Sequence, residues 1–118
     1  MIYVIATISL RPGKRAEFLE IFNENIPNVL AEEGCLSYQP TVDVGSGVLI
    51  QDIVREHVIT VVEQWESLER LRSHLVAPHM AAYSRAVKGM VEKVGLQVLE
   101  PVPGSELPAP REHGASLS

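Results

Sequence analysis

An α+β fold built on one antiparallel sheet is predicted by three observations. The 118 residues match the size of a single domain, and 46% of them are hydrophobic, enough to form a core. Apolar residues recur at every second position from Met1 to Leu10, which is the period of a strand. From about Lys14 to Glu33 the period lengthens to that of a helix, and both periods return later in the chain.

The predicted first strand has two faces that differ in polarity. One face is wholly apolar and consists of Ile2, Val4, Ala6, Ile8 and Leu10. The other face is only half polar and consists of Tyr3, Ile5, Thr7 and Ser9. The Arg11-Pro12-Gly13-Lys14 segment has the composition of a turn and separates this strand from the first helix.

The predicted first helix carries an apolar stripe on one side. The stripe consists of Phe18, Ile21, Phe22, Asn25 and Val29. Pro27 lies inside the helix and has no backbone donor, which predicts a kink between Asn23 and Pro27. Gly34 then supplies the residue type that commonly ends a helix.

Two further strands are predicted in the middle of the chain. Cys35 to Val44 is one of them, and Pro40 restricts it to a sheet edge or a bulge because proline cannot donate to a ladder. Gly45-Ser46-Gly47 is a turn, and Val48 to Glu56 is an irregular hairpin arm in which polar residues interrupt the apolar ones. Val58 to Glu66 is a clear strand, and both of its faces are substantially apolar.

A pair of helices and a last strand follow. Ser67 is a good N-cap, and the inner stripe of the short helix after it consists of Leu68, Leu71 and Leu75. Pro78 ends that helix and begins the next one. The stripe of the second helix consists of Met80, Tyr83, Val87, Met90, Val91 and Val94. Gly95 is expected to end this helix, and Leu96 to Glu100 to form the last strand.

This order of elements is the split β-α-β pattern of a ferredoxin-like domain, with an antiparallel sheet and its helices on one face. We assign residues 1–100 to this domain and residues 101–118 to a Pro-rich C-terminal tail, flexible or packed on a partner subunit. The sheet face away from the helices is too apolar to remain in water. A second copy packed sheet to sheet would cover it, which predicts a homodimer, with higher oligomers left open.

Composition argues against several classes of function. The formal net charge is −5 and the pI is about 5.3, whereas nucleic-acid-binding surfaces are basic. No run of about 18 apolar residues suggests a membrane span, and the N-terminus lacks the pattern of a signal peptide. The single cysteine, Cys35, excludes an intrachain disulfide. We therefore expect a soluble, cytoplasmic protein that binds neither nucleic acid nor membrane.

Cofactor and metal motifs are not evident. The sequence has no Gly-rich loop that would cradle phosphates. His74 and His79 are five residues apart across a proline, which differs from the i, i+4 pair of a helical zinc site. We expect no metal and no bound cofactor.

Four segments together resemble the antibiotic-biosynthesis monooxygenase (ABM) domain family. They are Gly34-Cys35-Leu36-Ser37-Tyr38, Glu63-Gln64-Trp65-Glu66-Ser67, Leu71-x-x-His74 and Pro78-His79-Met80. Each piece is weak alone, but the joint pattern is specific and the resemblance covers roughly Met1 to Glu100. It implies a small dimeric α+β barrel with a cavity between sheet and helices in each subunit.

The resemblance also implies a range of activities. Members of the family include monooxygenases that oxidise quinols or polyketide aromatics with dioxygen and without metal, flavin or haem. Another branch degrades haem, and others isomerise small metabolites. The haem-degrading branch uses an Asn on its first strand, and here Ile5-Ala6-Thr7-Ile8 contains none. The resemblance therefore favours a quinol-monooxygenase-like protein.

Three residues are candidates for catalysis: His74, His79 and Glu63. Each histidine lies at the margin of a helix stripe, and an imidazole is suited to removing a proton near neutral pH. Glu63 lies among apolar residues and needs a partner, which His74, His79 or a backbone donor can supply. The structural alternative is that His79 bonds the backbone at a helix start, His74 is a packing residue, and Glu63 points to a dimer interface.

Three aromatic residues are candidates for substrate binding: Trp65, Tyr38 and Tyr83. Trp65 ends a strand, Tyr38 lies on the strand before it, and Tyr83 lies on the stripe of the last helix. Packing in the core is the alternative role for each. Cys35 is read as a small buried hydrophobe.

These residues lead to one functional hypothesis and two alternatives. The leading hypothesis is a cofactor-independent monooxygenase that acts on a small aromatic or quinol-type substrate with dioxygen. The first alternative is a non-catalytic dimeric ligand-binding or stress-response module. The second is an isomerase of a small metabolite, which would use the same base without oxygen.

Overall fold

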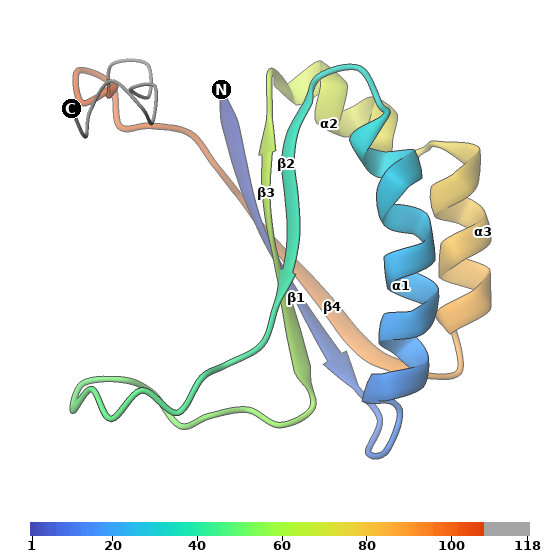
Figure 1. The fold of residues 1–118 in the computed structure, drawn as a ribbon. Helices are drawn as coiled ribbons and strands as arrows, with labels where there is room; N and C mark the ends of the chain where they lie inside the picture. The colour runs from blue at the N-terminus through green and yellow to red at the C-terminus, as the bar shows by residue number, and fades with distance from the viewer. Residues whose placement is uncertain (108–118) are drawn as a thin grey trace, which may run out of the picture.

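The computed structural model describes residues 1–107 and confirms the predicted α+β fold. Three helices cover one face of a four-stranded sheet (Figure 1). In chain order the elements are β1 (Ile2–Leu10), α1 (Arg15–Leu30), β2 (Cys35–Thr41), β3 (Val58–Trp65), α2 (Leu68–Leu75), α3 (Pro78–Val87) and β4 (Val91–Leu99).

The sheet is antiparallel throughout, with the strand order β2-β3-β1-β4. β1 therefore lies in the interior, and Ile8 is paired with Ile59 on one side and Val94 on the other. β2 and β4 are the two edges. Pro40 lies in edge strand β2, as its missing donor requires, and the register shifts between Cys35 and Ser37 in the same strand.

The core lies between the helices and the apolar face of β1, as the alternation predicted. All five residues of that face, Ile2, Val4, Ala6, Ile8 and Leu10, are buried. Phe18 and Phe22 of α1 are buried against it, and the ring of Phe22 stacks on Tyr38 with centroids 5.6 Å apart. α1 runs through Pro27 as one helix, and Gly34 follows it with φ +89°, a conformation that favours glycine.

The boundary between the last helix and the last strand was predicted wrongly. α3 ends at Val87 and β4 begins at Val91, so Gly95 lies inside the strand opposite Thr7. Val91 and Val94 fit a helical period, but they also fit a strand. Their backbones complete the ladder along the free edge of β1, which a longer helix would leave unpaired.

The inner stripe predicted for α2 is only partly correct. Leu71 is buried, but Leu68 and Leu75 are 43% and 49% exposed. His74 is buried in their place, with 2% of its surface exposed. α2 has only eight residues, so a single turn of its surface reaches the core, and that turn presents positions 71 and 74.

Residues 42–57 form a long loop, which we call the arm, and they contain no strand. The arm projects away from the sheet on the side opposite the helices (Figure 1). Its apolar residues include Leu49 and Ile50, which are 99% and 93% exposed. Asp43 and Arg55 close its base through paired contacts of 2.8 and 3.0 Å.

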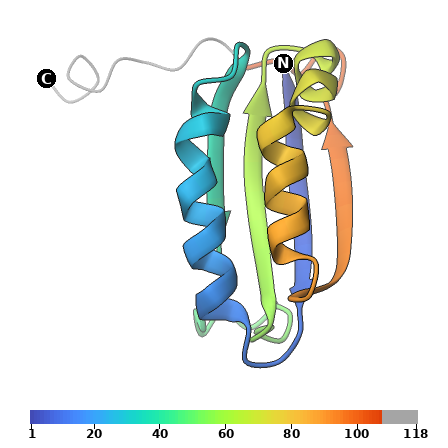
Figure 2. The same cartoon turned by 90° about the vertical axis from the view of Figure 1, so that its right-hand side faces the viewer.

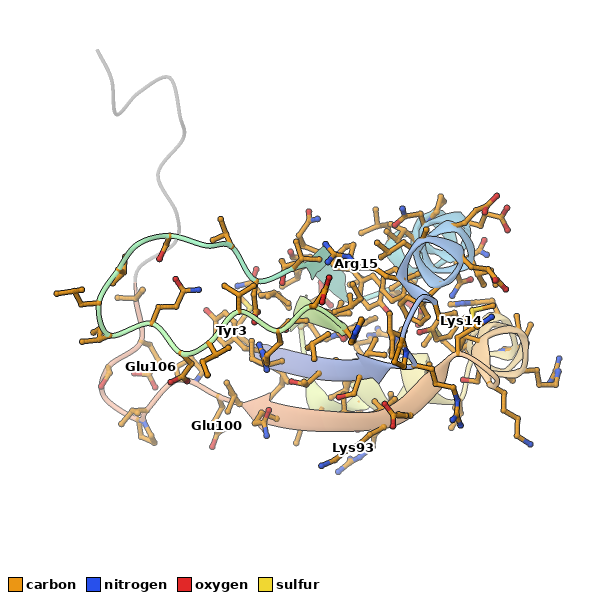
Figure 3. The ribbon with its side chains drawn as sticks, turned by 90° about the horizontal axis from the view of Figure 1, so that it is seen from below. Tyr3, Lys14, Arg15, Lys93, Glu100 and Glu106 are labelled. Carbon is orange, nitrogen blue, oxygen red and sulfur yellow. The ribbon has the colours of Figure 1, made fainter. Side chains whose placement is uncertain are left out.

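The sheet face away from the helices is not covered in the single chain. Figure 3 shows the helices on one side of the strands, with Tyr3 and the arm on the other. Val62 on this face is 40% exposed. Residues 100–107 contain no helix or strand, and the rest of the predicted tail, 108–118, lies outside the described residues. None of the helices within residues 1–107 is long and apolar enough to cross a membrane.

Candidate active site

A cavity of about 210 Å³ lies between the helix-facing side of the sheet and helices α2 and α3. Its floor comes from β1, β3 and β4, and its aromatic walls include Phe22, Tyr38 and Tyr83. Besides the two phenols, two further titratable groups, Glu63 and His74, line it. Such a cavity, mostly apolar and holding a few convergent polar groups, is the usual form of a small-molecule site.

His74 is held in place by Glu32, which lies just beyond the end of α1. The Nδ1 atom of His74 is 2.7 Å from Oε2 of Glu32, and the contact joins residues 42 positions apart. The imidazole also packs against two rings, with its centroid 4.6 Å from that of Trp65 and 5.6 Å from that of Tyr38. A carboxylate at Nδ1 fixes the tautomer with the proton on that nitrogen. Nε2 is then the free basic nitrogen of His74.

The environment of His74 favours the neutral imidazole. Burial lowers its pKa, and this effect outweighs the opposing contact with Glu32, which favours the charged form. His74 therefore carries a free lone pair at neutral pH. Glu32, with its side chain 15% exposed, is placed to stabilise the imidazolium once a proton arrives.

Glu63 is the second titratable group in the cavity, and only 4% of its surface is exposed. Its Oε1 accepts a hydrogen bond of 3.0 Å from Nε1 of Trp65. Burial raises the pKa of Glu63 to about 7, and the charge of Glu32 adds to this, while the bond from Trp65 acts in the opposite direction. Near neutral pH Glu63 therefore exists in both its acid and carboxylate forms.

Tyr38 and Tyr83 supply the hydroxyl-bearing walls of the cavity. Burial raises the pKa of both phenols, so both remain neutral and able to donate a hydrogen bond. The ring of Tyr83 meets Phe22 edge to face, with centroids 5.7 Å apart. These contacts hold the ring between α1 and the cavity.

His79 lies outside this cavity. It lines a separate groove of about 300 Å³ between α1 and α3, together with Asn25 and Asn28. Its Nε2 is 3.1 Å from the same Glu32 oxygen that contacts His74. Both ring nitrogens of His79 are buried without a hydrogen-bond partner among residues 1–107. The contact between His79 and Glu32 is therefore close but is not aligned as a hydrogen bond.

A nucleophilic cysteine and a metal ion are two other ways in which such a site could act. Burial raises the pKa of the Cys35 thiol, and the charges of Glu32 and Glu63 raise it further, which disfavours the reactive thiolate. Within residues 1–107 no three side chains of His, Cys, Asp or Glu are grouped so that they could hold a metal ion.

The cavity brings together four of the six residues singled out in the sequence: His74, Glu63, Tyr38 and Tyr83. Trp65 is fully buried and donates a hydrogen bond to Glu63, but it does not line the cavity. Neither histidine pairs with Glu63, since Trp65 occupies that role. Sequence reasoning missed Glu32, because it follows the first helix and no local signal links it to a histidine 42 residues later.

Comparisons with known proteins identify the family of this chain. The family model described as "Antibiotic biosynthesis monooxygenase" matches residues 1–86. The chain is 45% identical over 103 residues to "Probable quinol monooxygenase YgiN" of Escherichia coli (strain K12), covering 86% of this chain and 98% of that protein.

Solved structures show the same fold. A Caulobacter crescentus CB15 protein has a TM-score of 0.71 and 29% identity, with 86% of this chain and 89% of that chain covered. A Mycobacterium tuberculosis protein has a TM-score of 0.71 and 24% identity, with 89% and 98% covered. The family model spans most of the chain, and the relative from Escherichia coli is similar over nearly its whole length. The chain belongs to the antibiotic biosynthesis monooxygenase family, which supports a monooxygenase-type function.

Proposed function

We propose that the protein is a cofactor-independent monooxygenase that oxidises a small hydroxylated aromatic substrate of the quinol type with dioxygen. The observation that carries this proposal is the Glu32–His74 pair, which presents an oriented base to an aromatic-walled cavity. The name of the Escherichia coli relative supports a quinol as substrate.

The first step is removal of a proton from a substrate hydroxyl by Nε2 of His74. The imidazolium that results is stabilised by Glu32, 2.7 Å from Nδ1. The substrate anion is electron-rich, so it transfers one electron to triplet dioxygen. The substrate radical and superoxide then combine, which forms a C–O bond and leaves a peroxide on the ring.

The remaining steps return the protons. The His74 imidazolium gives its proton to the peroxide oxygen, and the neutral imidazole then takes the proton from the ring carbon that bears the hydroperoxide. The O–O bond breaks, and the departing oxygen takes a proton from the acid form of Glu63. The imidazolium then gives its proton to solvent, and Glu63 takes one back from solvent. One quinol and one dioxygen thus give one hydroxyquinone and one water, with no net proton released. The pKa of about 7 lets Glu63 act in this role near neutral pH.

Oxygen uptake with a panel of quinols tests the proposal. His74→Gln should lower kcat by about a hundredfold or more, the usual contribution of a general base. His57→Gln makes the same substitution on the exposed arm and is the matched control, for which we expect wild-type uptake. Circular dichroism confirms that the variants fold. Wild-type activity in a folded His74→Gln protein would remove this residue from the mechanism.

The assay also separates the alternatives. An isomerase would convert its substrate without consuming oxygen, and a binding module would bind quinols without turnover. Activity of protein freed of metal by chelation would support the absence of a cofactor, and restoration by an added metal would contradict it.

We also propose that the protein is a homodimer joined through the bare face of the sheet. Val62 lies on this face and is 40% exposed, and the arm projects from the same side (Figure 1). Sheet-to-sheet packing would cover both. Sedimentation at micromolar concentration should give a dimer, and a monomer would count against the proposal.

A further inference from the structure

β4 carries an apolar stripe that no helix covers. Val94, Leu96 and Val98 are paired with Ile8, Ala6 and Val4, so they share the helix-facing side of the sheet. Their partners are buried, but the three residues of the stripe are 57%, 42% and 46% exposed. Figure 2 shows the reason: α1 and α3 lie over the other strands, and β4 stands beside α3 with no helix in front of it.

The stripe is continuous with the cavity. Val94 and Leu96 are part of the cavity lining, and Leu75 of α2, 49% exposed, lines it as well. Val98 is the next residue along the same face but lies outside the lining. A molecule in the cavity can therefore extend onto Val98 along apolar surface without crossing a polar group of the sheet face.

The cavity is too small for a long substrate. A protein cavity of about 150 Å³ holds a benzene ring, and this one measures about 210 Å³. It accommodates an aromatic ring with small substituents. A hydrocarbon chain on such a ring would have to leave the cavity, and the β4 side offers it apolar contacts.

We propose that the natural substrate carries a hydrocarbon chain, with its hydroxylated ring in the cavity and the chain on the Val94–Leu96–Val98 stripe. The inference rests on the proposed function for the nature of the ring and adds the chain as a determinant of specificity. Sheet-to-sheet packing of the second copy proposed above would lie against the opposite side of the sheet, where Val62 is, and the sedimentation test below decides whether that copy also reaches the stripe.

Binding of two oxidised probes tests the inference without turnover. The probes are 2,3-dimethyl-1,4-naphthoquinone and 2-hexyl-3-methyl-1,4-naphthoquinone, which differ by five methylenes. Quenching of Trp65, the single tryptophan of the chain, reports binding. Burial of one methylene strengthens binding about fourfold. Because the stripe contacts one side of the chain, we count half of the five and expect the hexyl probe to bind about thirtyfold tighter.

The measured quantity is the dissociation constant of the dimethyl probe divided by that of the hexyl probe. Val98→Gln should lower the ratio several-fold, whereas Val44→Gln, the same substitution on the exposed arm, should leave it at the wild-type value. Val98→Thr keeps the side-chain shape and replaces Val98→Gln if that variant fails to fold.

Four outcomes overturn the inference. A wild-type ratio near one, with the dimethyl probe bound, refutes the chain subsite while leaving the proposed function intact. An unchanged ratio in the Val98 variants shows that the chain lies elsewhere. A Val98 variant that sediments as a smaller species than wild type shows that a second copy covers the stripe. Failure of both probes to bind refutes the chain subsite as well, and the oxygen-uptake assay with quinols then decides the proposed function separately.

Discussion

Replacement of Glu63 by Gln should stabilise the fold at alkaline pH and leave it nearly unchanged at acid pH. Glu63 is 4% exposed, and burial raises its pKa from 4.5 to about 7. Between these two values the folded protein binds more protons than the unfolded chain. The free energy of unfolding therefore falls as pH rises through this window. A neutral amide has no such dependence.

The magnitude follows from the shift. One pKa unit corresponds to about 1.4 kcal/mol, so a rise from 4.5 to about 7 costs the wild type about 3 kcal/mol above pH 7. Gln at position 63 keeps an oxygen that can accept the Trp65 Nε1 bond. We thus expect Glu63→Gln to gain about 3 kcal/mol at pH 8.5 and close to none at pH 4.

Urea unfolding at fixed protein concentration between pH 4 and pH 8.5 measures this difference. Glu20→Gln is the matched control, because its side chain lies on the exposed side of α1, in water whether the chain is folded or not. A stability difference between Glu63→Gln and wild type that is constant across the pH range would refute the reasoning. So would a loss of stability at pH 8.5.

Three further substitutions test other parts of the fold. Gly34→Ala should lower the free energy of unfolding by roughly 1–3 kcal/mol, because φ is +89° and the added Cβ would collide with an α2 side chain; Gly13→Ala, with φ +80° and open space, should cost less in the same urea titration. Ser67→Ala removes the hydroxyl that caps α2 and should lower the melting temperature by an amount corresponding to about 1 kcal/mol, with Ser67→Asp close to wild type. Asp43→Asn weakens the contacts to Arg55 and should speed proteolytic cleavage within residues 42–57, while the melting temperature stays near the wild-type value.

The parts of the fold that sequence could predict are those where local pattern and tertiary packing agree. The alternation of β1 and the cap at Ser67 depend on neighbours within a few residues. The end of α3 could not be predicted, because Val91 and Val94 satisfy both periods. The strand is selected because these residues pair with the second edge of β1, and that pairing exists only in the assembled sheet.

The same distinction applies to the candidate site. His74 and Glu63 stood out as polar residues in apolar surroundings. Their partners did not, since the Glu32 contact depends on how the end of α1 meets α2. The exposure of Leu75 was missed because a stripe shows which residues share a face, not how far the covering layer reaches.

The place of β1 in the sheet has a consequence for the time course of synthesis. Tyr3 pairs with Gln64 on one side and with Leu99 on the other. At about 5–20 residues per second, the ribosome needs roughly 2–7 s to add the 35 residues from Gln64 to Leu99. During that interval β1 has an open edge, and the cavity has no floor on its β4 side. Nascent chains that end before Val91 should therefore bind chaperones and fail to hold an aromatic ligand.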